Sequence, residues 1–119
     1  MAEELKFEHF AINVKDPVAT AAWYCENLAM KVVRRGEGPV FMHFLADATG
    51  RVVLELYTNP PELVPNYASQ DPQVLHIAFA SPNMEETIGR LTKAGDQLAM
   101  LRDPWGFSIQ LAERAESMV

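Results

Sequence analysis

The sequence FEHFAINVKDP occupies residues 7–17 and decides how the fold begins. Residues 7–14 alternate between strongly apolar and less apolar side chains with a period of two, which is typical of a strand that buries one face. Asp16 and Pro17 follow at once and provide a helix N-cap and a first-turn proline. Because apolar residues continue at helical spacing over residues 18–28, the stretch predicts a strand that leads into a helix.

A second copy of this pattern starts at VLHIAFASPN, residues 74–83. It predicts a strand at 74–81 and a helix that opens at residues 82–83 and closes at residues 93–95. The other β-rich runs are residues 30–34, 40–46 and 51–58 in the first half, the last two as a hairpin, and residues 97–101 and 106–112 in the second. The chain therefore contains an internal repeat.

The repeat predicts an α+β fold in which two βαβββ-type modules form an open, curved mixed β-sheet with helices on the outside. We expect a single domain over residues 1–119, with module one at 5–58, a proline-rich connector at 59–73 and module two at 74–114. Module two is about one strand shorter than module one. Either it is trimmed or the sequence lacks a segment after Gly95; we favour the second explanation, because a missing strand exposes a sheet edge and core.

The composition narrows the range of partners. The 119 residues carry a formal net charge of −6 with acids and bases interspersed, so neither nucleic acid nor a membrane surface is an expected partner. No apolar run approaches the roughly 20 residues that span a bilayer. The single cysteine, Cys25, cannot form an internal disulfide, and the start of the sequence lacks the features of an export signal. We therefore expect a cytoplasmic protein.

Four polar residues occupy matching positions in the two halves. Superposing the halves places His9 on His76 and Glu55 on Gln110, each on the less apolar side of its strand. Two imidazoles, a carboxylate and an amide oxygen form a donor set suited to a divalent ion such as zinc, nickel, iron(II), manganese or cobalt. The repeat therefore predicts a metal site with these four residues as ligands.

Four segments carry a resemblance to a known family. The segments HFAINVKDP (9–17), VVLELYTN (52–59), LHIAFAS (75–81) and DPWGFSIQLAER (103–114) resemble conserved segments of the vicinal oxygen chelate superfamily, particularly its glyoxalase I and bleomycin-resistance-like members. The resemblance implies that the positions of His9, Glu55, His76 and Gln110 hold the metal ligands, as in glyoxalase I. It also implies a homodimer, and whether the site forms within one chain or across two chains stays open.

One position departs from the resemblance. Where the glyoxalase I members have a glutamate that binds the metal and moves the substrate proton, this chain has Gln110. An amide cannot accept a proton at neutral pH, which argues against ordinary methylglyoxal chemistry and against ring-cleaving dioxygenase chemistry. Glu55 remains as the candidate catalytic base, placed to remove a proton from a substrate that presents two adjacent oxygens to the ion.

Two hypotheses of function follow from these residues. The first is a metal-dependent lyase or isomerase of the glyoxalase type, with a divalent ion as its cofactor. The alternative is a metal-free small-molecule binding protein of the bleomycin-resistance type, whose histidines are hydrogen-bonded to protein groups. Simpler roles stay open for single residues: Glu55 as an ion-pair partner of Arg51, Arg34 or Arg35, Gln110 as an ordinary polar residue, and His43 as a further pocket residue.

Overall fold

The computed structural model describes residues 3–91 and 100–113. The chain divides into two compact units, Met1–Pro65 and Asn66–Val119, which we call the N-terminal and the C-terminal unit. Sequence features predicted around Gly95, at residues 97–99 and at residue 114 lie outside the described residues. Within the described part of the chain, no helix combines the length and the apolar character needed to cross a lipid bilayer.

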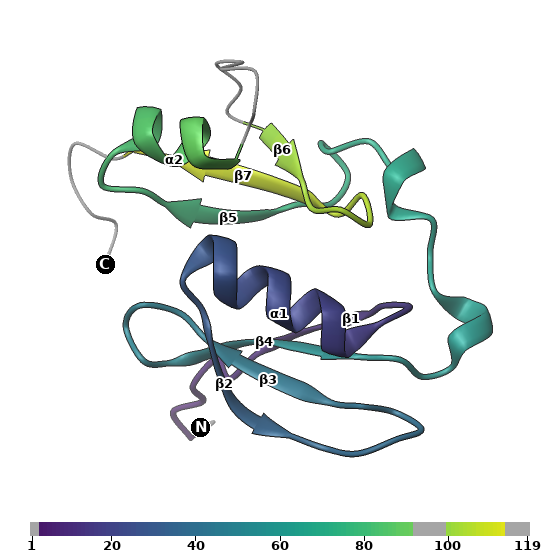
Figure 1. Ribbon diagram of the computed structural model, residues 1–119. Helices are drawn as coiled ribbons and strands as arrows, with labels where there is room; N and C mark the ends of the chain where they lie inside the picture. The colour runs from purple at the N-terminus through teal and green to yellow at the C-terminus, as the bar shows by residue number, and fades with distance from the viewer. Residues whose placement is uncertain (1–2, 92–99, 114–119) are drawn as a thin grey trace. The chain divides into compact units, whose positions relative to one another are not determined.

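The N-terminal unit has the predicted βαβββ order. Its elements are β1 (Phe10–Asn13), α1 (Pro17–Leu28), β2 (Lys31–Arg35), β3 (His43–Ala46) and β4 (Val52–Tyr57). The strands form one mixed sheet in the order β1-β4-β3-β2 (Figure 1). β1 is parallel to β4, whereas β3 is antiparallel to both β4 and β2. The predicted hairpin is thus confirmed as β3 and β4, and Gly50 closes its turn with a φ of 84°.

In the N-terminal unit, β1 and β3 begin clearly later than the sequence predicts. β1 starts at Phe10, because its ladder with β4 begins at the pair Phe10 and Leu54. β3 starts at His43, because Phe41 has a φ of 50° and takes the backbone out of the extended conformation. As a result, His9 lies immediately before β1 and not within it.

Helix α1 covers one face of this sheet (Figure 1). The carboxylate of Asp16 accepts a hydrogen bond from the Ala19 N–H at 3.0 Å and Pro17 occupies the first turn, so the predicted helix start is confirmed. The buried core of the unit includes Ile12, Thr20, Ala21, Tyr24, Leu45, Leu54 and Leu56. Because side chains alternate along strands, the residues between these strand positions lie on the opposite face, which we call the open face.

Over its described residues, the C-terminal unit repeats this plan with fewer strands. Its elements are β5 (Ile77–Ala80), α2 (Met84–Leu91), β6 (Met100–Arg102) and β7 (Ser108–Ala112). The sheet order is β5-β7-β6, with β5 parallel and β6 antiparallel to β7. In the described residues the order is therefore βαββ, which agrees with the strands predicted for module two and is one strand fewer than in module one. Ile88 of α2 and Ile109 and Leu111 of β7 are buried.

The predicted connector is more regular than its prolines indicate. It contains two short 3-10 helices, η1 (Pro61–Leu63) and η2 (Tyr67–Ser69). Proline is compatible with η1, because the first residues of a helical turn need no backbone donor. Within the C-terminal unit, Arg102 joins η2 to the turn after β6, since its guanidinium donates to the carbonyl oxygens of Tyr67 at 3.0 Å and Gly106 at 2.7 Å.

Candidate metal centre

His9 and Glu55 approach each other on the open face of the N-terminal sheet. Nε2 of His9 lies 3.3 Å from Oε1 of Glu55. The backbone explains this approach, because Ala11 is paired with Glu55 in the parallel ladder of β1 and β4, and His9 lies two residues before Ala11. The two side chains are 26% and 18% exposed, respectively. They are therefore partly shielded from water and still open to a small ligand.

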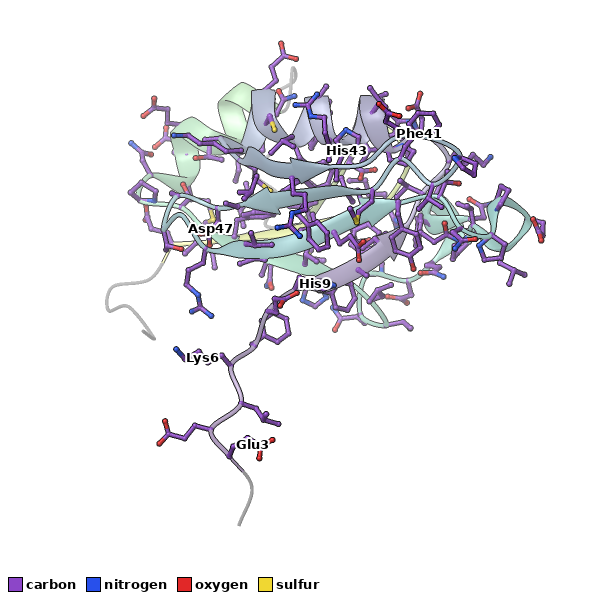
Figure 2. The ribbon with its side chains drawn as sticks, turned by 90° about the horizontal axis from the view of Figure 1, so that it is seen from below. Glu3, Lys6, His9, Phe41, His43 and Asp47 are labelled. Carbon is purple, nitrogen blue, oxygen red and sulfur yellow. The ribbon has the colours of Figure 1, made fainter. Side chains whose placement is uncertain are left out.

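The second ring nitrogen of His9 has a partner of its own. Nδ1 of His9 lies 2.8 Å from a carboxylate oxygen of Glu8. An ionised carboxylate only accepts hydrogen bonds, so Nδ1 is the donor in this contact, and Nε2 is the nitrogen that faces Glu55. The rings of His9 and Phe44 are nearly perpendicular to each other, with centroids 5.1 Å apart. Figure 2 shows His9 where the extended segment from Glu3 through Lys6 meets the strands.

His76 and Gln110 occupy the equivalent positions in the C-terminal unit. Ala78 is paired with Gln110 in the parallel ladder of β5 and β7, and His76 lies two residues before Ala78. Nδ1 of His76 donates to the carbonyl oxygen of Pro72 at 2.7 Å, so Nε2 is again the nitrogen left for another ligand. His76 is exposed and Gln110 is half-buried, and within the described residues no hydrogen bond joins the two.

The two units therefore repeat one arrangement of donors. In each, a histidine stands just before the first strand, and an oxygen donor stands in the parallel strand beside it. Across residues 3–91 and 100–113, no group of three His, Cys, Asp or Glu side chains is close enough to hold a metal ion. Each unit thus supplies one pair of donors, and the nitrogen and oxygen atoms of these pairs suit the predicted divalent ion chemically.

The simpler role considered for Glu55 requires an arginine partner. The guanidinium of Arg51 donates instead to the carbonyl oxygen of Phe7 at 3.3 Å. Among the described residues no arginine lies within ion-pair distance of Glu55, whose partner is His9. Glu55 is therefore paired with a potential metal ligand and not with a structural cation.

His43 lies away from the candidate centre. It is 4% exposed and is paired with Leu56, which places it on the sheet face covered by α1. Its Nδ1 donates to the carbonyl oxygen of Phe41 at 2.7 Å. Figure 2 shows His43 and His9 at separate places on the N-terminal sheet. The third histidine is thus part of the core of this unit and does not join the open face.

The sequence pattern does not predict two contacts of the centre. Glu8 precedes β1, so the alternation of side chains along the strand does not predict its contact with His9. Its position next to His9 in the sequence is the only signal of this contact. Phe44 is opposite Glu55 in the antiparallel ladder of β3 and β4. The register that brings Phe44 to His9 depends on a shift between Leu45 and Ala46, which the sequence does not reveal.

A known protein family matches the part of the chain that contains His9, Glu55 and His76. The family model described as the Glyoxalase/Bleomycin resistance protein/Dioxygenase superfamily matches residues 6–109. The chain belongs to this superfamily. The match confirms the predicted resemblance to vicinal oxygen chelate proteins and their α+β fold. It includes His9, Glu55 and His76 and ends one residue before Gln110.

Solved structures agree with this superfamily membership. The trypanothione-dependent glyoxalase I of Leishmania major is 27% identical, with a TM-score of 0.72 and coverage of 92% of this chain and 87% of that one. A glyoxalase family protein from Enterococcus faecalis is 24% identical, with a TM-score of 0.66 and coverage of 91% and 97%. TnmS3, an antibiotic binding protein from Streptomyces sp. CB03234, is 17% identical, with a TM-score of 0.71 and coverage of 97% and 100%. No curated protein sequence matches the chain.

Proposed function

We propose that this superfamily member is a metal-dependent lyase or isomerase of the glyoxalase type, acting on a small molecule with two adjacent oxygens. The observation that carries the proposal is the repeated ladder register, Ala11 with Glu55 and Ala78 with Gln110, which gives each unit a histidine and an oxygen donor at matching positions. The similarity to the Leishmania major glyoxalase I supports the same type of chemistry.

His9, Glu55, His76 and Gln110 would hold the divalent ion. When bound, the ion would act as a Lewis acid toward the substrate oxygens. The carboxylate of Glu55 accepts the proton from the carbon next to the substrate carbonyl and returns it to the neighbouring carbon. Gln110 supplies only an amide oxygen, which does not take up a proton, so Glu55 carries out both transfers.

The assembly and location belong to the same proposal. We infer a homodimer, because a chain of this size gains buried surface from a second copy. In each site, His9 and Glu55 would be joined by His76 and Gln110, either of the same chain or of its partner. A cytoplasmic location is consistent with the single Cys25, which has no partner within the chain for a disulfide.

Elemental analysis of protein purified without chelator tests the metal. We expect a stoichiometric divalent metal in the unchanged protein and a loss of metal affinity of more than about 100-fold in His9→Ala, since even partners of metal ligands change affinity 10- to 100-fold. His43→Gln is the matched control, because His43 is on the covered face and its replacement leaves the metal content unchanged.

A metal-free binding protein is the second candidate. It is favoured by one specific observation: both ring nitrogens of His9 already contact carboxylate oxygens, of Glu8 at 2.8 Å and of Glu55 at 3.3 Å. Unchanged protein that contains no metal, takes up none from solution and binds apolar small molecules would replace the first proposal by this one.

A further inference from the structure

A β-bulge in the edge strand β2 changes which face its arginines occupy. Val32 is paired with Leu45, but the next pair in the ladder is Arg34 with Phe44, so Val33 is the extra residue. Val33 is 58% exposed. Without the bulge, regular alternation would place Arg34 on the face covered by α1. The bulge moves it to the open face, and bulges often redirect side chains beside functional sites.

The shifted register places Arg34 in the same row as the candidate base. Phe44 is paired with Arg34 on one side and with Glu55 on the other. Glu55 is in turn paired with Ala11. The row across the open face is therefore Ala11, Glu55, Phe44 and Arg34. Two strand spacings separate Arg34 from Glu55, or roughly 10 Å between their Cα atoms.

The guanidinium of Arg34 has no charged partner among the described residues. Arg34 is exposed, and among the described residues it has neither an ion pair nor a hydrogen bond from its guanidinium. The formal net charge of the chain is −6, so an anionic ligand needs a local cation to approach this face. A guanidinium binds a carboxylate through two parallel hydrogen bonds, which gives both affinity and orientation.

We propose that Arg34 is a specificity residue that binds a carboxylate on the substrate, while the two adjacent oxygens of that substrate lie at His9 and Glu55. This inference rests on the function proposed above and adds the substrate class, a small vicinal-oxygen compound with a second, distal anionic group. The apolar ring of Phe44 lies beneath the carbons that join the two ends. Arg35 is paired with His43 on the covered face and has no such role.

Two matched probes test the proposal by calorimetry. Both 2-oxoglutarate and 2-oxopentanoate present two adjacent oxygens on a five-carbon chain, but only 2-oxoglutarate has a distal carboxylate. We expect zinc-loaded protein to bind 2-oxoglutarate about tenfold more tightly. Arg34→Met should remove this preference, Arg34→Lys should retain part of it, and Arg35→Met should leave it unchanged. Zinc affinity is expected to be the same in all four proteins.

The outcomes separate this proposal from the function on which it rests. Equal affinities for the two probes in the unchanged protein, or a preference that survives in Arg34→Met, would overturn the role of Arg34. Protein that binds no zinc would overturn the metal-dependent function instead. The same two titrations on metal-free protein then still decide the role of Arg34, because a preference lost in Arg34→Met supports it and equal affinities exclude it.

Discussion

Replacing Glu55 by glutamine is expected to slow metal-dependent exchange of substrate α-protons by about 10²- to 10⁴-fold. Glutamine keeps the length of the side chain and one oxygen donor, but its amide cannot accept a proton. The equivalent position in the other unit cannot compensate, because it is Gln110. The chain therefore has one carboxylate at the two matching positions, and the proposed proton transfer depends on it alone.

The exchange of the CH₂ protons of hydroxyacetone for deuterium, followed by NMR at saturating zinc, measures this effect. Hydroxyacetone has two adjacent oxygens and an exchangeable α-proton, and excess zinc separates loss of the base from loss of metal affinity. Gln110→Glu is the matched control, since it retains Glu55 and adds a carboxylate, and we expect its rate to equal or exceed that of the unchanged protein. A rate in Glu55→Gln close to that of the unchanged protein would remove Glu55 from the role of base.

Replacing Gly106 by alanine is expected to destabilise the protein by about 2–5 kcal/mol. Gly106 has a φ of 95°, a backbone conformation that residues other than glycine rarely adopt. An added Cβ would also lie 2.5 Å from the Cα of Ala68 in η2. Because this neighbour is backbone, relief requires the segment that Arg102 holds against the turn to move. Strain and overpacking therefore add at one position.

Urea unfolding at a fixed protein concentration, followed by circular dichroism, measures the loss of stability in Gly106→Ala. Gly50→Ala is the matched control, because Gly50 has a φ of 84° but its added Cβ would meet no atom within 4 Å. It should cost only about 1–2 kcal/mol from backbone strain. Equal losses in the two variants would show that the contact with Ala68 contributes nothing.

The period of the apolar residues predicts much of the fold. The strand before α1, the helix itself and the β3–β4 hairpin follow from alternation, from Asp16 and Pro17 and from the turn residues. The ends of the strands do not follow from these signals, because pairing decides them: β1 begins where Leu54 offers a partner, and β3 begins after the unusual backbone of Phe41. Local propensity contains neither fact.

Only part of the candidate centre can be predicted from the sequence, for the same reason. The equivalence of His9 with His76 follows from the repeat, and the ladder register agrees with it. The partners of the ring nitrogens and the place of Arg34 depend on irregular backbone. The sequence offers Arg34 and Arg35 equally as neighbours of Glu55, and only the bulge shows that Arg34 shares a face with Glu55.

The metal environment of zinc-loaded protein, measured by X-ray absorption spectroscopy, tests the central claim most directly. The claim is that His9 and His76 bind the same ion, together with the oxygens of Glu55 and Gln110. The account predicts two imidazoles per zinc in the unchanged protein and in His43→Gln, and one imidazole at excess zinc in either His9→Ala or His76→Ala. One imidazole in the unchanged protein, or two in either of these alanine variants, would contradict it.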